Sequence, residues 1–404
     1  MATKSKLRGY KMRKNLQFCA LLGFVFFAAA SVLSAWTGPT RLTWSARNSW
    51  AQDMAIGNGI HSNNIHIVYV ENLGGGNYEV YYKNSTDYGA TWNSPVRLTW
   101  AAGYSTTPRI ALGSSQNIYV VYADDRTGKT LVYFKKSTDG GSNWSASTAL
   151  ATLDSCFSPD IAVQSSGATT YIHVVMTWWG GSRGYDIVHK RSTTEGDSWT
   201  SLNLVGQMDT NSSFPSIAAD SLGNLHVAWV ENVNSNNEIY YRKNTSYGGY
   251  SSWTTAERIT WNSGNSIDPY ITVDPSNNVY LAWSDNNFGA YDILFKKKGP
   301  TTPWGIIYRL TYTTGDARRP NLCVYETLKV HLAFYDDTRN SNDEIYYNYS
   351  SDGGNNWGIL QRLTWTNAES INPTLGVDYT NKDTHLIYCD KIFRNYHEVI
   401  YKKD

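Results

Sequence analysis

Short runs of alternating polar and apolar residues fill the chain after residue 36, and the same succession of runs returns about every 53 residues. No 3.6-residue helical periodicity is present there, so strands are expected throughout. Each repeat is expected to contain four strands. The first follows a proline, as in Pro215-Ser-Ile-Ala, and the second has the pattern His/Tyr, apolar, Ala/Val, aromatic, any, acidic, as in 226–231. The third opens with an acid, as in Glu238-Ile-Tyr-Tyr, and the fourth carries Arg-Leu-Thr or a close variant, as at Arg258. Four such strands make one propeller blade.

A tryptophan marks each repeat, and self-similarity at this period indicates one supersecondary unit stacked on its neighbours. Residues 366–404 supply only three strands, whereas 36–44 match 92–100 and supply a fourth. The sequence therefore predicts an all-β, seven-bladed β-propeller of four-stranded antiparallel blades, in a single domain over 36–404. The N-terminal strand at 36–44 completes the C-terminal blade and closes the ring, which leaves no open sheet edge. The marking tryptophans are Trp36, Trp92, Trp144, Trp199, Trp253, Trp304 and Trp357.

Opposite charges recur on the third and fourth predicted strands. Such positions on adjacent strands indicate cross-strand ion pairs. One histidine position also recurs between repeats, which favours packing and a hydrogen bond over a metal or catalytic role. The expected ion pairs are Glu79–Arg97, Glu238–Arg258, Asp292–Arg309, Glu344–Arg362 and, across the closure, Arg41–Glu398, and the histidines are His66, His173, His226, His331 and His385.

The N-terminus follows a different pattern. Six Lys and Arg residues within 4–14 precede an apolar run over 18–33, with Ser34 and Ala35 after it. This arrangement is typical of a secretory signal peptide, which predicts that 1–35 is removed and that the protein is secreted, periplasmic or extracellular. The alternative is an uncleaved membrane anchor, because the run approaches the roughly 20 residues that span a bilayer.

Charge and cysteine content narrow the function classes. The full chain has 35 Lys+Arg and 34 Asp+Glu. Six of the former and none of the latter lie in 1–35, so the mature chain would carry a net charge of −5. An acidic exported protein has no electrostatic basis for binding nucleic acid. The three cysteines after 35 are no disulfide framework, and Cys323 takes a small core position that is Ala in other repeats. No zinc-ligand spacing or cofactor motif is present, and a structural calcium ion is left open.

The turn between the third and fourth strands carries a motif with the pattern Ser/Thr-x-Asp-x-Gly-x-x-Trp. Three full copies stand in register, and the motif resembles the Asp-box, the bacterial neuraminidase repeat of the sialidase superfamily. Aspartate is expected to cap backbone N–H groups in the turn, glycine to permit a positive φ, and tryptophan to pack into the blade. The copies are Ser85, Asp87, Gly89 and Trp92; Ser137, Asp139, Gly141 and Trp144; and Ser350, Asp352, Gly354 and Trp357.

The resemblance implies that these turns lie on the face opposite the active site, so they carry no catalytic residue. For a sialidase it also implies three arginines that hold a substrate carboxylate, an Asp acid/base and a Tyr activated by a Glu. The first arginine of that set belongs to a Phe/Tyr-Arg-Ile-Pro motif. This chain has no such motif, and Pro108-Arg109-Ile110 carries similar residues in another order.

Ligand-binding candidates are sought where the repeat breaks, in loops of the other face, at the mouth of the central channel. The third repeat has Trp178 where others have an acid, followed by Trp179, Arg183 and Asp186, and Leu204 replaces the arginine partner of Asp186. Paired tryptophans beside charged groups suit a sugar. The alternative is that both tryptophans pack onto a neighbouring blade.

A second break reads Asp316-Ala-Arg318-Arg319, before the sixth inner strand. Tandem arginines suit a carboxylate or sulfate, or form a solvated pair. Further candidates in loops of the same face are Arg126, Arg339 and Arg394.

The leading hypothesis is an exported propeller that binds a glycan or a partner protein on its loop face without catalysis. One alternative is an exo-acting glycoside hydrolase that resembles sialidases. Another is a structural assembly module.

Overall fold

The computed structural model describes residues 35–57, 61–151, 155–181, 184–206, 210–338, 342–391 and 396–404, without the side chain of Ala51. The predicted signal peptide over 1–35 lies outside these residues except for Ala35. Trp36–Asp404 forms one compact unit. Within the described ranges, no helix has the length and apolar character needed to cross a membrane.

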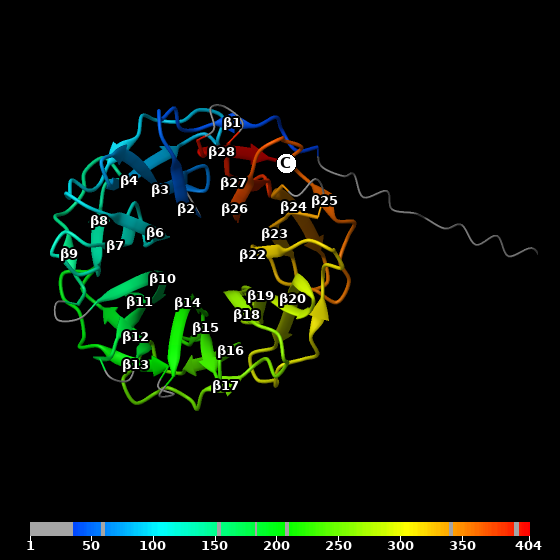
Figure 1. Cartoon of the computed structure of the whole chain (residues 1–404). Coiled ribbons are helices and arrows are strands. Elements are labelled where there is room, and N and C mark those ends of the chain that lie inside the picture. The colour runs from blue at the N-terminus through cyan, green and yellow to red at the C-terminus, as the bar shows by residue number, and fades with distance from the viewer. Residues whose placement is uncertain are drawn as a thin grey trace, which may run out of the picture. The chain divides into compact units, whose positions relative to one another are not determined.

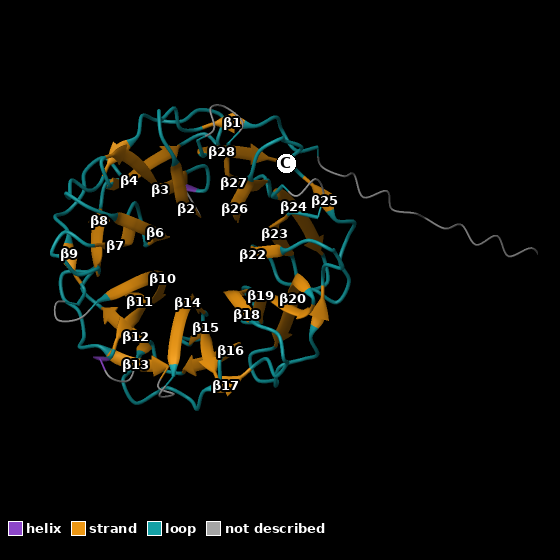
Figure 2. Ribbon diagram, viewed as in Figure 1, coloured by secondary structure: helices purple, strands orange, loops and turns teal. Residues whose placement is uncertain are grey.

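Seven four-stranded antiparallel sheets make up this unit. They are arranged in a ring, as Figures 1 and 2 show. The described residues include no α-helix. The seven-bladed all-β prediction is therefore confirmed. Blades 1 to 6 each use four consecutive strands from β2 to β25, and blade 7 has the order β1-β28-β27-β26.

The strands of each blade run from the channel outward. The inner strands are β2 (Ser49–Ile56), β6 (Ser105–Leu112), β10 (Cys156–Ser166), β14 (Asn211–Ala219), β18 (Ser266–Val273), β22 (Ala317–Val324) and β26 (Ser370–Val377). The second strands are β3 (Ile65–Gly74), β7 (Ile118–Asp124), β11 (Thr169–Trp179), β15 (Leu225–Val233), β19 (Val279–Phe288), β23 (Val330–Asp336) and β27 (Thr384–Asp390).

Shorter strands make the periphery. The third strands are β4 (Asn77–Ser85), β8 (Leu131–Ser137), β12 (Tyr185–Ser192), β16 (Asn236–Asn244), β20 (Ala290–Lys298), β24 (Glu344–Ser350) and β28 (Glu398–Lys403). The outer strands are β1 (Thr40–Arg41), β5 (Val96–Arg97), β9 (Thr148–Ala149), β13 (Asn203–Gly206), β17 (Glu257–Arg258), β21 (Tyr308–Arg309) and β25 (Gln361–Arg362).

The two chain ends meet in blade 7. β1 pairs with β28, Thr40 opposite Tyr401 and Arg41 opposite Ile400. The Leu42 N–H donates to the Val399 carbonyl at 2.9 Å, and the Leu42 side chain is buried in a core cluster shared with blade 1. The predicted closure by the segment at 36–44 is confirmed.

The repeated tryptophans join each blade to the one before it. Trp144 of blade 2 packs edge-on against Tyr82 of blade 1, with ring centroids 5.1 Å apart. All seven tryptophans make the same kind of contact, at 5.0 to 5.6 Å, and Trp36 and Trp92 carry it across the closure. Edge-to-face packing at this separation is favourable for aromatic rings. The period in the sequence therefore reflects an inter-blade contact.

The inner strands differ from the prediction in one respect. They begin before the proline: β6 starts at Ser105, three residues ahead of Pro108. Every inner strand has a β-bulge, and in blades 2 to 7 the proline lies within it, as between Thr106 and Arg109 in β6. A bulged residue makes no regular ladder hydrogen bond, so the missing proline N–H is tolerated there.

The predicted cross-strand ion pairs are all present. Their N–O distances are 2.6 to 2.8 Å, the acids are at most 1% exposed, and the arginines are 13 to 28% exposed. The histidine prediction also holds, since His66, His226, His331 and His385 each bond a tyrosine hydroxyl through Nδ1 at 2.6 to 2.8 Å. His173 pairs instead with His189. Cys323 packs against the core of blades 6 and 7 as predicted.

The Ser-x-Asp-x-Gly-x-x-Trp turns have the expected geometry. The Ser137 hydroxyl donates to the Asp139 carboxylate at 2.8 Å and accepts from the Gly141 N–H at 2.9 Å. The Asp139 carboxylate also accepts from the Asn143 N–H at 2.9 Å, and Gly141 has a φ of 95°. The turns at 85–92 and 350–357 repeat this arrangement.

Candidate functional site at the channel mouth

The alternation of strand directions gives the propeller two faces. The upper face carries the loops that lead into the inner strands and the loops between second and third strands. The lower face carries the Ser-x-Asp-x-Gly-x-x-Trp turns. Each inner strand starts at the upper face, and its bulge lies a few residues below that edge.

The bulges give the channel mouth an unusual backbone. In blades 2 to 7 the residue before the proline has a positive φ of 47 to 56°, although none is glycine. A non-glycine residue in this region costs roughly 1–2 kcal/mol. The six residues are Thr107, Ser158, Phe214, Asp268, Arg319 and Asn372.

These six residues line a cavity of about 380 Å³, which we name the channel cavity. The residue two positions after each of them lines it as well, and Asp53 takes that place in blade 1. This second set is Asp53, Arg109, Asp160, Ser216, Tyr270, Asn321 and Thr374. Neither set repeats from blade to blade, unlike the residues that form the scaffold.

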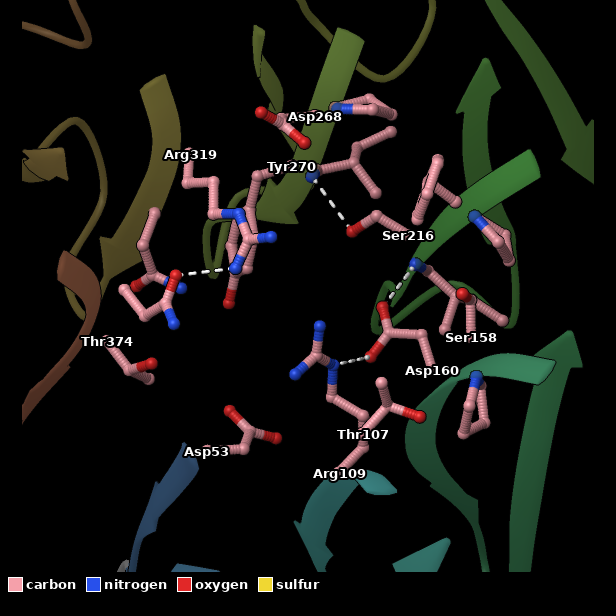
Figure 3. A pocket seen from close by; sticks show the side chains of 18 of the residues that line it. Asp53, Thr107, Arg109, Ser158, Asp160, Ser216, Asp268, Tyr270, Arg319 and Thr374 are labelled. Atoms are coloured by element: carbon pink, nitrogen blue, oxygen red, sulfur yellow. Dashed lines mark hydrogen bonds and ion pairs between the residues drawn. The ribbon is translucent and has the colours of Figure 1, made fainter. Parts of the chain in front are cut away.

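Charged groups face one another across the channel cavity (Figure 3). Arg109 Nε lies 3.6 Å from Asp160 Oδ1, and the two side chains are 41% and 17% exposed. Asp53 Oδ2 accepts from the Ile110 N–H at 2.9 Å, and Asp160 Oδ2 accepts from the Ile217 N–H at 2.9 Å. Each carboxylate therefore also ties its blade to a neighbouring one.

Burial in the channel shifts the pKa values of these side chains. Burial raises the pKa of Asp53 to about 6, opposed by the Arg109 guanidinium and reinforced by the Asp160 carboxylate. Burial also raises the pKa of Asp160, again opposed by Arg109. The pKa of the Tyr270 hydroxyl is raised by burial and then by Asp53 and Asp160, so it remains a hydrogen-bond donor. Carboxyl groups of this kind in a cleft are typical of functional sites.

Two further side chains complete the cavity on the side of blades 4 to 6. Phe214 lines the cavity and is 56% exposed. Arg319 is exposed, and its guanidinium donates to Asn372 Oδ1 of blade 7. Burial raises the pKa of Asp268, opposed by Arg319 and Arg318. The cavity therefore combines an aromatic face with cations, carboxylates and a phenol.

Among the predicted candidates that lie within the described residues, Arg319 lines the channel cavity and the others do not. Arg318 lies next to it but pairs with Asp316 at 2.9 Å and covers the Tyr291 ring at 4.1 Å. The tandem arginines thus point to different partners, one toward the channel and one toward the neighbouring blade.

Other predicted residues lie away from the cavity. Trp178 packs on the core between blades 2 and 3, as the packing alternative predicted, whereas Trp179 is 40% exposed and contacts Tyr185. Asp186 is 1% exposed, so it presents no carboxylate to solvent. Arg126 binds Asp124 of its own blade through two nitrogens, at 2.8 and 2.6 Å. Arg183, Arg339 and Arg394 lie outside the described residues.

Sequence reasoning missed most of the lining. Asp53, Arg109, Asp160, Phe214 and Tyr270 all lie inside inner strands, and each of them except Asp53 is next to the proline of its repeat. The usable signal was the variation itself: the residues on either side of the proline read Thr/Arg, Ser/Asp, Phe/Ser, Asp/Tyr, Arg/Asn and Asn/Thr in successive blades.

In the described part of the chain, no three His, Cys, Asp or Glu side chains are grouped so that they could hold a metal ion. The channel cavity is lined by two arginines and three aspartates, so it offers both forked N–H donors and carboxylate acceptors to a polar ligand.

The chain matches no protein-family model and no curated protein. Several solved structures share its fold. One is a PL25 ulvan lyase bound to -[GlcA(1-4)Rha3S]-, with a TM-score of 0.61 and 11% identity over 90% of this chain and 95% of that one. Another is the polysaccharide lyase Uly1, with a TM-score of 0.58 and 9% identity over 87% and 88% of the two chains. The phage phi92 endosialidase follows, with a TM-score of 0.53 and 12% identity over 91% and 68%. At these identities the similarity concerns the fold, which in this chain is a seven-bladed β-propeller.

Proposed function

We propose that the protein binds an acidic saccharide unit of a glycan in the channel cavity. The observation that carries this proposal is the convergence of unlike, non-repeating side chains from all seven blades on one cavity of about 380 Å³. That volume lies within the range of small-molecule sites. The strained backbone at six of the lining residues supports the same interpretation, because strain of this kind persists mostly at functional positions.

The chemistry of the lining gives each group a role. Arg319 and Arg109 supply forked N–H donors for a carboxylate or sulfate. The exposed ring of Phe214 packs against the apolar C–H face of a sugar. Asp160 accepts hydrogen bonds from sugar hydroxyls. An acidic sugar satisfies all three kinds of group at once.

The comparisons support a glycan as the ligand class. The ulvan lyase was solved with a glycan that contains a uronic acid and a sulfated rhamnose, and the phage protein is an endosialidase. Uronic acids, sulfated sugars and sialic acids are all acidic sugars. We also infer export through the predicted signal peptide, which would place the protein where such polymers occur.

A second candidate function is cleavage of the bound glycan. It is favoured by Asp53, whose pKa of about 6 would let it exchange protons near neutral pH. Tyr270 and Arg109 interact electrostatically with Asp53 and would stabilise negative charge that develops on the substrate. In this scheme Asp53 is the proton donor or acceptor and the arginines hold the acidic group.

Binding is tested on an array of carboxylated, sulfated and neutral oligosaccharides. We expect wild type to bind the acidic members, and Arg319→Ala to lower the affinity about tenfold or more, the usual effect of losing a charged hydrogen bond. Lys382→Ala is the matched control, because it removes a cation from an exposed ion pair on the lower face. Equal binding of neutral and acidic sugars, or an unchanged Arg319→Ala, would contradict the proposal.

Cleavage is tested by the release of reducing ends from the same glycans. If Asp53→Asn abolishes release and retains affinity, the protein is an enzyme with Asp53 in the reaction. If wild type binds but releases nothing, the non-catalytic hypothesis holds. Absence of binding to every glycan leaves the assembly-module hypothesis.

A further inference from the structure

A second repeated feature lies far from the channel, at the outer rim of the upper face. In five blades the outer strand is followed by an aromatic residue that is 68 to 75% exposed. Each one is preceded by an arginine and a threonine in the pattern Arg-x-Thr-aromatic. We call these residues the rim aromatics: Trp44, Trp100, Trp261, Tyr312 and Trp365.

The rim aromatics occupy an arc and leave a gap. Trp261, Tyr312, Trp365, Trp44 and Trp100 follow the outer strands of blades 4, 5, 6, 7 and 1, which are consecutive around the ring (Figure 1). Blades 2 and 3 break the pattern. They have Ala149 and Leu204 in place of the arginine, and Thr152 and Gln207 follow in sequence where the aromatic would stand.

Each rim aromatic rests on its own arginine. The guanidinium carbon of Arg258 lies 4.1 Å from the Trp261 ring centroid, and the other four distances are 4.5 to 5.7 Å. The arginine is fixed in turn, since its Nε donates to the threonine carbonyl at 2.6 to 3.0 Å in all five blades. One ring face is therefore supported, and the residue remains mostly open to solvent.

The charge of each of these arginines is balanced. The same arginine pairs with a buried acid of the third strand, for example Arg97 with Glu79 at 2.7 Å. Because the guanidinium charge is already compensated, the rim offers little net attraction to phosphate groups of nucleic acid or anionic lipid. The rings also stand on five separate blades, one after each outer strand. Flat, neutral, evenly repeated platforms suit the C–H faces of sugar rings.

We propose that the rim aromatics are stacking platforms for a neutral polysaccharide, which several blades bind at once. Repeated weak sites on one rigid body add up to a much higher avidity than any single site. The platform arc is separate from the channel cavity, so this inference does not depend on the function proposed above.

The test is affinity electrophoresis of the full protein in gels that contain mixed-linkage β-glucan, galactomannan or xyloglucan. We expect at least one polymer to retard wild type. The triple variant Trp100→Ala/Trp261→Ala/Trp365→Ala should lose the retardation, and each single variant should weaken it by about three- to tenfold. Trp→Phe variants at the same positions should keep most of it, because the flat ring remains.

The matched control is Tyr250→Ala/Ile359→Ala, which removes two apolar side chains that are 78% and 80% exposed outside the arc. Arg319→Ala should also bind these neutral polymers like wild type, which separates the rim from the channel. Retardation that survives the triple variant would overturn the proposal, as would its absence with all three polymers. Binding to phosphatidylcholine or phosphatidylglycerol vesicles alone, or a rim-dependent change of oligomeric mass alone, would overturn it too.

Discussion

The lower-face turns and the channel-mouth bulges both place residues at positive φ, but they fill the position differently. In the turns it holds Gly89, Gly141 and Gly354, and an added Cβ would meet an aromatic ring of the preceding blade at 2.0 to 2.5 Å. In the bulges it holds six different non-glycine residues whose side chains line the cavity. Close packing against the preceding blade excludes a side chain at this position of the turns, whereas the bulges leave their side chains available to a ligand.

The largest expected loss of stability comes from a substitution in a lower-face turn. Gly141→Ala adds a methyl group 2.4 Å from the buried Tyr82 ring at a φ of 95°, so we expect a loss of about 3 kcal/mol in unfolding free energy. Gly128→Ala is the control, since it has a φ of 80° but no atom within 4 Å, and should cost only about 1 kcal/mol. Urea unfolding measures both. Equal costs would show that packing against the preceding blade contributes nothing.

The next effect concerns the repeated ion pairs. Arg362→Ala leaves the Glu344 carboxylate, 1% exposed, without its cation. Removing one partner of a fully buried pair costs 3–5 kcal/mol, and the partial exposure of Arg362 reduces this to about 2 kcal/mol. Binding in the channel cavity should not change. Chemical denaturation beside glycan binding checks this, and a loss of affinity without a loss of stability would reverse the roles we assign to repeated and non-repeated positions.

Ionisation of Asp53 in the channel and of Asp139 on the lower face should change the unfolding free energy in opposite directions. The pKa of Asp53 is raised to about 6, so its ionisation lowers stability as pH rises from about 4 to about 6. Asp53→Asn should therefore match wild type near pH 4 and exceed it by about 1 kcal/mol at pH 7, with channel water limiting the effect. Thermal and urea unfolding across this range measure the difference. A variant no more stable than wild type at pH 7 would contradict the assignment.

Asp139 should behave in the opposite way. Hydrogen bonds from Asn143 and Ser137 lower its pKa to about 2, so its carboxylate supports the fold above about pH 4 and that support is lost as pH falls toward 2. Asp139→Asn should be less stable than wild type at pH 7, and the difference should vanish in acid. The same unfolding series measures this difference. If Asp53→Asn and Asp139→Asn changed stability at pH 7 in the same direction, the contrast between the faces would be wrong.

The smallest expected effect on stability comes from a substitution in the channel lining. Phe214→Ala removes a ring that is 56% exposed, so the unfolding free energy should change by less than about 0.5 kcal/mol. Affinity for an acidic oligosaccharide should fall by about fivefold, through the loss of stacking on the sugar. Calorimetric titration and a melting curve on the same sample give both values. A large loss of stability would mean that the ring supports the scaffold.

The sequence alone determined the scaffold. The repeats made the scaffold recognisable. Residues equivalent to Trp144, Glu238 and Arg258 stand at fixed places in most repeats, and each contacts a partner whose position also recurs. The closure by 36–44 followed from counting strands, and the ion pairs followed from opposite charges that recur on adjacent strands. Contacts that recur in successive blades produce a periodic pattern in the sequence.

Only the tertiary structure decided the site. Asp53, Arg109, Asp160 and Tyr270 lie about one repeat or more apart along the chain, and the ring brings them to one cavity. Burial also separated candidates that looked alike, since Trp178 packs between blades while Arg319 faces the channel. Which side chains converge depends on the bulge in each inner strand, and a bulge is a backbone geometry that residue types alone do not specify.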